Sequence, residues 1–508
     1  MGENRFLSFF VAFISISLIA QTKSLPRSTP EQEGVSSESI VNLIDAFEKK
    51  IEFVHSYMIV KNGKVISEGW WDPYGPNIPH ELWSLSKSFT STAIGFAVEE
   101  GLIQIHDFVK DYFPEKSPEN PTWQLKQLRV KDLLTMSTGH TSEPRLGQSS
   151  DDWVKHFLES ELKLRPGTYF MYNTPATYML SAIIQRVTGE KLVDYLYPRL
   201  FEPLGIDRPE WEMDPEGINT GGWGLHLTTE DIAKFGVFYI QEGKWNGNQL
   251  LSSDWIKMAT SKQVSNGSDP DNDWSQGYGF QFWRSRFNTY RGDGAMGQFC
   301  LVIPEHNTIV AITSGTDNMG GIMEIVWDKL LPKMNSSEMI FNPEWIDILR
   351  KKSASLELKP VDGKMSKGLA KKFFNKKIKI AKNKEGVEFI FFNSKKNQVE
   401  IKVNDKIETI AFGFEKYIKS ELNGHLPFTS SKHKIIPESS LRYKKNKKIA
   451  ASGAWITENE FKLRIYQYET PSRLDYIFNF KNGKLKWDCK KSNALGSGNQ
   501  IESIKSIL

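Results

Sequence analysis

Three serines in the chain stand three residues before a lysine, at Ser84–Lys87, Ser160–Lys163 and Ser431–Lys434. On a helix, residues three apart lie on one face, so each lysine is placed to accept the proton of its serine. A helix N-terminus adds positive potential beside the serine, which favours the negative charge that develops during acyl transfer. The spacing alone is a weak signal, because solvated helix faces and loops also produce it. At least two of the three pairs must be chance matches.

The surrounding sequence favours the first pair. Residues 82–90 read LWSLSKSFT and open a strongly apolar helical pattern from Ser84 to Glu100, which ends at Gly101. Lys87 is expected to be partly desolvated there, and desolvation favours the neutral, proton-accepting form of a lysine. Ser84 is therefore the candidate nucleophile, and Lys87 is the candidate base.

The segment around Ser84 resembles the active-site helix of the serine β-lactamase and penicillin-binding protein superfamily. It is most similar to the class C-like branch, which includes esterases, D-aminopeptidases and 6-aminohexanoate-dimer hydrolases. Further segments match the family in the same order: residues 166–173 (PGTYFMYN), 221–225 (GGWGL) with 228–235, and 292–298 (GDGAMGQ). The resemblance covers roughly residues 25 to 335. Several ordered matches are far more specific than any single motif.

The resemblance implies a role for each matching residue. Ser84 is the expected acylated nucleophile, Lys87 its proton acceptor, and Tyr172 the group that protonates the leaving group and later helps to activate water. The expected oxyanion hole consists of the backbone N–H groups of Ser84 and Ala295. A phenol can shuttle protons only if a nearby cation stabilises its phenolate, and Lys87 is the candidate. Without the flanking residues 166–168, Tyr172 would be interpreted as a half-buried aromatic with a satisfied hydroxyl group.

The expected substrate-binding residues include two departures from the family pattern. These residues are Asn173, Thr174, Asp293 and Gly294. Thr174 stands where the family has the Asn of its Tyr-x-Asn element, so a hydroxyl group replaces a side-chain amide. Gly292 stands where the family has Lys or His, and Asp293 replaces Thr. This removes the cation that holds the carboxylate of penicillins. Arg291 is adjacent, but a shift of one residue on a strand points its side chain to the other face.

These departures predict weak or no β-lactam hydrolysis. An acidic Asp293 near the site disfavours anionic acyl donors and leaves neutral or cationic esters, amides or short peptides. Asp293 and Gly294 also read as turn residues before an edge strand, and in that case the charge preference of the substrate stays open.

The elements that position these motifs predict an α+β fold, and the resemblance implies a β-lactamase-like antiparallel sheet flanked by helices and a helical subdomain. Ser56 to Trp70 forms two short strands around the turn dipeptide Asn62-Gly63. A second predicted hairpin joins strands at 298–303 and 308–313. Helices are expected at 130–136, 174–187 and 229–241, so strands near both ends enclose a helix-rich middle.

The charge distribution predicts a second unit. The net charge of +4 hides a split, because residues 1–350 hold 31 Lys and Arg against 45 Asp and Glu, and residues 351–508 hold 34 against 16. We expect a hydrolase domain over residues 25–345, a linker over 346–384 and a basic, mostly β domain over 385–508. Residues 451–487 resemble the lipocalin-like extension of some β-lactamase-related hydrolases. The basic domain either holds the protein on an anionic cell-envelope surface, docks the acidic domain, or is simply solvated. No nucleic-acid motif is present, so nucleic acid is not an expected partner.

The N-terminus predicts export. Phe6 to Ala20 is an uncharged apolar run, which has the length of a signal-peptide core, so residues 1–24 are the expected signal peptide. An uncleaved membrane anchor is the alternative, and a secreted or periplasmic location follows from the first reading. The chain has two cysteines, Cys300 and Cys489, which we interpret as packing residues. No His or Cys cluster has metal-ligand spacing, so neither a metal nor another cofactor is expected.

The sequence therefore predicts an exported serine hydrolase that forms an acyl-enzyme on Ser84 and cleaves small-molecule or peptide substrates: esters, amides or short (D-)peptides. Two alternatives stay open. One is a catalytically silent binding protein that kept the fold, and the other is a penicillin-binding, DD-peptidase-like enzyme.

Overall fold

The computed structural model describes residues 23–146, 152–334, 342–365, 373–422, 424, 426–428, 447–481, 483–491 and 501–506. Residues 1–22 of the expected signal peptide, the Ser431–Lys434 motif and Asn482 lie outside them. None of the helices in the described part of the chain has the length and hydrophobicity needed to cross a bilayer. Cys300 and Cys489 are both buried, and neither forms a disulfide within the described residues.

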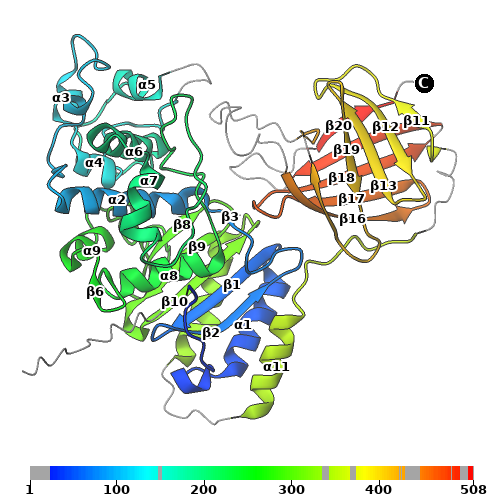
Figure 1. The fold of residues 1–508 in the computed structure, drawn as a ribbon, viewed down its shortest axis with the longest axis horizontal. Coiled ribbons are helices and arrows are strands. Elements are labelled where there is room, and N and C mark those ends of the chain that lie inside the picture. The colour runs from blue at the N-terminus through cyan, green and yellow to red at the C-terminus, as the bar shows by residue number, and fades with distance from the viewer. Residues whose placement is uncertain are drawn as a thin grey trace, which may run out of the picture.

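A six-stranded antiparallel sheet forms the centre of the first domain, in the order β2-β1-β10-β9-β8-β7 (Figure 1). Its strands are β1 (Val54–Lys61), β2 (Lys64–Trp70), β7 (Trp283–Arg284), β8 (Tyr290–Gly294), β9 (Gln298–Ile303) and β10 (Thr308–Ser314). Asn62 and Gly63 between β1 and β2 both have positive φ, 53° and 77°, which confirms the predicted tight turn. Side chains alternate between the two faces, so Met58 and Val60 pack on one side and Tyr57 and Ile59 on the other.

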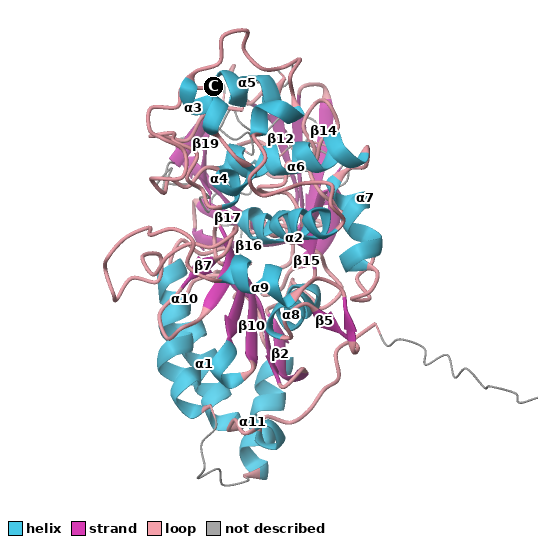
Figure 2. Ribbon diagram, turned by 90° about the vertical axis from the view of Figure 1, so that its left-hand side faces the viewer, coloured by secondary structure: helices cyan, strands magenta, loops and turns pink. Residues whose placement is uncertain are grey.

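Helices cover both faces of this sheet. One face carries α1 (Ser37–Lys50), α10 (Met319–Ile325) and α11 (Pro343–Ala354). The other face carries α2 (Ser86–Glu99) and α8 (Thr229–Ile240). A helical subdomain lies at the end of the domain opposite to α1 and α11 (Figure 2). It contains α3 (Trp123–Gln127), α4 (Val130–Leu134), α5 (Trp153–Glu159), α6 (Thr174–Thr188) and α7 (Leu192–Leu196).

Shorter elements complete this domain. Strands β3 (His80–Glu81) and β4 (His226–Leu227) pair with each other, as do β5 (Lys244–Trp245) and β6 (Asn248–Gln249), and helix α9 spans Ser253–Thr260. The short turns are η1 (Glu31–Glu33), η2 (Trp83–Leu85), η3 (Val109–Tyr112), η4 (Tyr197–Phe201), η5 (Pro304–His306), η6 (Val326–Leu330) and η7 (Leu331–Lys333). The observed elements confirm the predicted α+β class, its hairpins and its main helices.

The C-terminal region is a β domain whose strands follow one another in sequence order. One sheet contains β11 (Lys377–Lys379), β12 (Val387–Asn393), β13 (Gln398–Val403) and β14 (Lys406–Ala411). The other contains β15 (Ile418–Leu422), β16 (Lys447–Thr457), β17 (Glu460–Tyr466), β18 (Arg473–Lys481), β19 (Lys484–Lys491) and β20 (Ile501–Lys505). A bridge between Ile380 and Ser506 brings the first and last strands together, and aromatic side chains fill the space between the sheets. This architecture confirms the predicted mostly β domain. Helix α11 crosses the boundary expected at residue 345, and β11 begins inside the expected linker.

The β domain packs against the strands that lead to Ser84. The guanidinium of Arg473 lies 3.7 Å from the ring centroid of Phe53, in a cation–π contact. The backbone N–H of Glu81 donates to the carbonyl of Glu469 at 2.9 Å, and the hydroxyl of Tyr74 donates to the carbonyl of Thr470 at 3.1 Å. Since Glu81 is three residues before Ser84, the β domain helps to fix the approach to the candidate nucleophile.

Candidate active site

Ser84 lies in η2, immediately before helix α2, and its side chain is half-buried. The preceding residue, Trp83, has a φ of 50°, which is a left-handed conformation that L residues rarely adopt. Such a conformation costs of order 1 kcal/mol and is frequent at functional sites. The unusual turn sets Ser84 directly at the N-terminal end of α2, where the helix dipole favours negative charge.

Lys87 is buried beneath Ser84, and only 1% of its surface is exposed. Its Nζ donates to Ser84 Oγ at 3.1 Å, to the carbonyl of Gly222 at 2.8 Å and to Thr174 Oγ1 at 3.4 Å. Burial lowers the pKa of Lys87 to about 7, although the charges of Glu143 and Asp293 oppose this shift. At neutral pH a large share of the molecules therefore carries an uncharged amine that can accept the proton of Ser84.

Tyr172 forms a side-chain hydrogen bond with Ser84. The Tyr172 ring stacks on Trp283, with centroids 5.4 Å apart, and Lys87 Nζ lies 5.1 Å from the centroid of the Tyr172 ring. Burial is the main cause that raises the pKa of Tyr172 far above its ordinary value, and Asp293 adds to it. The phenol is therefore protonated in the resting protein, so Lys87 rather than Tyr172 is the group able to take a proton from Ser84.

The glycine before Ala295 brings the end of β8 against the segment that leads to Ser84. A Cβ added to Gly294 would lie 2.0 Å from the carbonyl oxygen of Leu82, so only glycine lets β8 approach the segment that leads into η2. Ala295 is less buried than the residues on either side of it. This placement fits the expected pairing of the Ser84 and Ala295 N–H groups. Gly294 serves through its backbone and offers no side chain to a substrate.

Thr174 and Asn173 behave differently, although they are neighbours in sequence. Thr174 Oγ1 contacts Lys87 as described above, in the place expected for the family's amide. Asn173 is fully buried, and its side chain accepts from the backbone N–H of Ala176 and donates to Thr138 Oγ1 at 3.1 Å. Asn173 thus caps α6 and ties it to the loop after α4. This corrects the prediction that the Asn173 side chain contacts the substrate.

Asp293 is nearly buried and forms an ion pair with a neighbour on its own strand. Arg291 Nε donates to Asp293 Oδ2 at 2.9 Å, and Trp274 Nε1 donates to the same oxygen at 3.1 Å. Arg291 is fully buried, and its guanidinium lies 4.6 Å from the ring centroid of Trp274. Burial raises the pKa of Asp293, while Arg291 and Trp274 oppose this shift. The carboxylate near the site is therefore largely compensated by a local cation.

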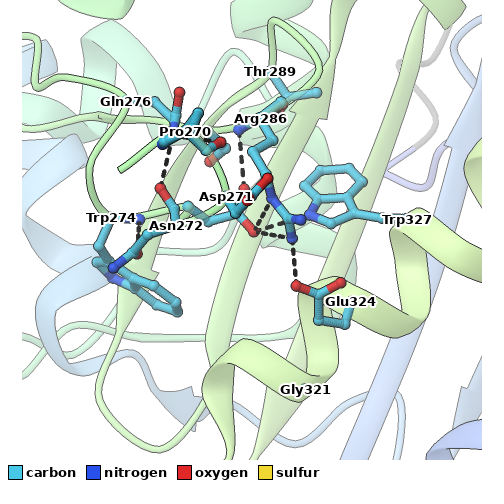
Figure 3. Close-up of polar contacts among 12 residues, drawn as sticks. Pro270, Asp271, Asn272, Trp274, Gln276, Arg286, Thr289, Gly321, Glu324 and Trp327 are labelled. Carbon is cyan, nitrogen blue, oxygen red and sulfur yellow. Dashed lines mark hydrogen bonds and ion pairs between the residues drawn. The ribbon is translucent and has the colours of Figure 1, made fainter. Parts of the chain in front are cut away.

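The loop that carries Trp274 is held by a second charged network (Figure 3). Arg286 bridges two carboxylates, because its Nη2 contacts Asp273 Oδ2 at 2.8 Å and also Glu324 of α10. Trp327 Nε1 donates to the same oxygen of Asp273 at 3.0 Å. Arg291 Nη1 donates to the carbonyl of Asp273 at 3.0 Å, which links this network to β8. The loop therefore presents Trp274 to Asp293 in one fixed arrangement.

Comparison with known proteins identifies the family. A sequence model described as Beta-lactamase matches residues 51–328, which is more than half of the chain. The chain belongs to the beta-lactamase family. This confirms the resemblance seen in the sequence, and the members of this family are serine hydrolases.

Individual relatives of this beta-lactamase-family protein are distant. It is 24% identical over 268 residues to the 6-aminohexanoate-dimer hydrolase of Paenarthrobacter ureafaciens, an alignment that covers 48% of this chain and 68% of the relative. It is 29% identical to Protein flp of Staphylococcus aureus strain MW2, over 29% of this chain and 33% of that protein. Among solved structures, a Bacillus anthracis protein described as a 6-aminohexanoate-dimer hydrolase superposes with a TM-score of 0.50 at 18% identity. That superposition covers 61% of this chain and 86% of the other, and it supports the fold alone.

Three residues at the site of this beta-lactamase-family protein have roles that were not predicted from the sequence. They are Gly222, Glu143 and Gln298. A Cβ on Gly222 would lie 2.7 Å from Thr174 Cγ2, so glycine is needed for its carbonyl to reach Lys87. Gln298 Nε2 donates to the carbonyls of Ala295 and Ser314, at 3.0 and 2.8 Å, and so holds the turn of the expected oxyanion hole. Gly222 and Gln298 fall within the motifs that carried the resemblance. Nothing in the local sequence marks Glu143.

A large cavity lined by described residues lies away from Ser84. It measures about 790 Å³ and is lined by charged residues of both signs from the two domains, among them Asp207, Lys234 and Glu469. No catalytic candidate lines it. The hydrogen-bonded group around Ser84, rather than the size of a cavity, therefore identifies the candidate active site.

Proposed function

We propose that this protein is a serine hydrolase that forms an acyl-enzyme on Ser84, with esters, amides or short peptides as acyl donors. The observation that carries the proposal is the contact between Ser84 Oγ and the buried amine of Lys87, whose pKa is lowered to about 7. Burial of a lysine reduces the stability of the fold, and a strongly shifted pKa beside a possible nucleophile is typical of functional sites.

In the proposed acylation step, Ser84 Oγ bonds to the carbonyl carbon of the substrate, and the Ser84 proton moves to neutral Lys87 Nζ. The carbonyl oxygen becomes an oxyanion that the N–H groups of Ser84 and Ala295 stabilise. The bond to the leaving alcohol or amine then breaks. Tyr172 gives its proton to that leaving atom and is reprotonated by Lys87, which returns to its neutral form.

Deacylation repeats these steps with water as the nucleophile. Water bonds to the acyl carbon, and its proton passes through Tyr172 to Lys87. The bond to Ser84 Oγ then breaks, and Ser84 takes the proton back from Lys87. The product is a carboxylic acid, and the enzyme returns to its starting state. The contacts among Ser84, Lys87 and Tyr172 support these steps.

The surroundings of β8 support a preference against penicillins. A Cβ at Gly292 would lie 2.4 Å from Leu85 Cδ1 and 2.6 Å from Ser88 Oγ, so this position has no room for a cationic side chain. Arg291, the nearest cation on the strand, already pairs with Asp293. A free carboxylate on a substrate therefore lacks a partner on β8. Amides of linear amino acids whose carboxyl group is blocked are included among the proposed substrates because a relative is named 6-aminohexanoate-dimer hydrolase.

A substrate panel tests the proposal against its two alternatives. Purified protein is assayed with p-nitrophenyl butyrate, butyryl p-nitroanilide and a chromogenic cephalosporin, with Ser84→Ala as the matched control. We expect turnover of the ester, slower turnover of the anilide and little or none of the cephalosporin, all lost in Ser84→Ala. No turnover of any compound supports the silent binding protein. Stable labelling by fluorescent penicillin supports the DD-peptidase-like enzyme.

We also propose that the protein acts outside the cytoplasm, where its basic β domain meets an anionic envelope surface. Exposed lysines on and after β11 support this proposal, among them Lys377, Lys379 and Lys382. Co-sedimentation of the full chain with phosphatidylglycerol vesicles tests it. Binding that is strong at low salt, lost at high salt and absent with phosphatidylcholine vesicles is expected. Equal binding to both vesicles contradicts it.

A further inference from the structure

Glu143 lies in the loop between α4 and α5, at the edge of the Ser84 site. Its Oε1 accepts a hydrogen bond from the backbone N–H of Thr174 at 2.7 Å. Thr174 in turn contacts Lys87 through its hydroxyl group. The Glu143 carboxylate is therefore separated from the catalytic amine by a single residue, yet its side chain is exposed to solvent.

The charges around Ser84 leave Glu143 as the uncompensated group. Arg291 and Asp293 neutralise each other on β8. Lys87 has its pKa lowered to about 7, so its amine is increasingly uncharged as the pH rises above 7. Within the part of the chain that the structure describes, no Lys, Arg or His lies within ion-pair distance of Glu143. The site therefore presents one exposed negative charge to an incoming substrate.

Aromatic faces lie on the same side of the site. Tyr172 is two residues before Thr174, and its ring stacks on the half-buried indole of Trp283. A carboxylate next to aromatic faces suits an ammonium group, because the ring quadrupole and the carboxylate both attract the cation. Tyr172 is also the group that protonates the leaving atom, so this is the side on which the leaving group departs.

We propose that Glu143 is a specificity-determining residue that binds an ammonium group on the leaving-group portion of the substrate. The substrate class is then an ester or amide whose alcohol or amine part carries a positive charge. This inference rests on the proposed serine hydrolase function. The hydrogen bond to Thr174 occupies one carboxylate oxygen as a cap of α6, and the second oxygen serves the cation.

The test compares two esters that differ only in charge. Butyrylcholine carries a quaternary ammonium group, and 3,3-dimethylbutyl butyrate is its neutral isostere; both give the same butyryl-enzyme. The value of kcat/KM is measured for each with the wild type and with Glu143→Gln, which keeps the oxygen that accepts from Thr174. Glu159→Gln, which neutralises an exposed carboxylate of α5, is the control.

We expect Glu143→Gln to lower the ratio of kcat/KM for butyrylcholine to kcat/KM for the neutral ester about fivefold, as befits a partly solvated ion pair. Because the charge of Glu143 also acts on the pKa of Lys87, both esters are measured above pH 8, where Lys87 is neutral. The wild-type preference for the cation should shrink at high salt. An equal loss with both esters overturns the proposal and assigns Glu143 to helix capping alone. An unchanged ratio of the two kcat/KM values overturns it as well.

A binding measurement separates this inference from the proposed function. Saturation-transfer NMR of choline, which cannot be hydrolysed, reports contact with the protein without any turnover. A signal from the wild type and from Glu159→Gln that falls in Glu143→Gln supports the cation site even if no ester is cleaved. Equal signals from all three proteins overturn it, whatever the activity.

Discussion

Two Ser-x-x-Lys segments of the described chain have the same spacing but differ in burial, in hydrogen bonding and in their position relative to a helix. Lys87 is 1% exposed and lies 3.1 Å from Ser84 Oγ, at the start of a buried helix. The Lys163 side chain is 56% exposed and contacts Glu161 at 3.5 Å. Ser160 ends α5, and its hydroxyl group contacts the carbonyl of Phe157 and His140 Nε2 instead. The same four-residue pattern therefore gives a hydrogen-bonded serine–lysine pair in one place and two side chains with separate partners in the other.

The contrast shows that spacing alone does not bring a lysine amine into contact with a serine. Burial and position at the start of a helix do so at Lys87, and burial lowers its pKa. Helix α5 ends at Glu159, so Ser160 and Lys163 do not share a helix face. Segments distant in sequence cover Lys87: Gly222 provides a carbonyl, and Thr174 provides a hydroxyl group. Desolvation by these neighbours lowers the pKa of Lys87 to about 7. An exposed lysine has no comparable reason to release its proton near neutral pH.

Replacement of the base gives the largest expected difference between the two segments. Lys87→Met should lower kcat/KM for p-nitrophenyl butyrate by about 10³-fold or more, because Ser84 loses its proton acceptor. Lys163→Met is the matched variant and should stay within twofold of the wild type. Similar losses in both variants, or no loss in either, would contradict the distinction between the two pairs.

The same two variants should separate in stability. The pKa of Lys87 is about 7 in the folded state and 10.5 when unperturbed. The folded protein must therefore bury a charge below pH 7, and folding must release a proton between pH 7 and 10.5. This penalty is complete below pH 7 and fades as the pH rises toward 10.5. Lys87→Met should therefore raise the free energy of unfolding by about 2 kcal/mol at pH 7. Thermal unfolding measures it, and a Tm that falls in Lys87→Met but not in Lys163→Met would refute the account.

Loss of the Tyr172 hydroxyl group should have the next largest effect. Tyr172→Phe removes the proton donor to the leaving group but keeps the ring that stacks on Trp283. We expect kcat/KM to fall about 10²-fold for the anilide and less for p-nitrophenyl butyrate, whose leaving group needs no proton. Steady-state assays with both substrates decide this. Equal losses would argue that Tyr172 supports structure instead of proton transfer.

The pH profile should show a change of about tenfold between pH 6 and the plateau above pH 7. Only neutral Lys87 accepts the Ser84 proton, and its pKa is lowered to about 7, so kcat/KM should rise with pH and level off. Measurement with an uncharged ester from pH 5.5 to 9 gives the apparent pKa. A rise centred near pH 10 would mean that burial does not shift Lys87.

The smallest expected effect comes from the turn at the oxyanion hole. Gln298→Ala removes the two side-chain hydrogen bonds that hold the carbonyls of Ala295 and Ser314. We expect kcat to fall about fivefold with little change in KM, since the N–H of Ala295 acts on the transition state more than on the bound substrate. A variant that binds more weakly without losing kcat would assign Gln298 to substrate binding.

Local rules predicted the elements that carry the chemistry. The Asn62-Gly63 turn, the helix after Ser84 and the helix that starts at Thr174 each follow from short-range patterns. Asn173 shows a missed local signal, because an Asn directly before a helix is a favoured N-cap, and that role turns its side chain away from the substrate. Alternation along a strand accounts for Arg291 and Asp293 on one face of β8, but it did not predict that they would form an ion pair with each other.

Other parts of the site could not follow from local sequence. The carbonyl that covers Lys87 comes from Gly222, 135 positions away in the sequence. The need for glycine at 222 follows from the contact with Thr174, which only the folded structure shows. Glu143 reaches the site through a tertiary contact with Thr174, 31 positions along the chain. These contacts depend on how helices pack, which neither periodicity nor propensity encodes.

The most direct test of the account is covalent labelling of Ser84. The protein is treated with a fluorophosphonate at pH 7.5, digested and mapped by mass spectrometry. We expect a single adduct on the peptide that contains Ser84. It should be absent in Ser84→Ala and should form much more slowly in Lys87→Met. An adduct on Ser160 or another serine, or labelling of Ser84 that proceeds equally well without Lys87, would contradict it.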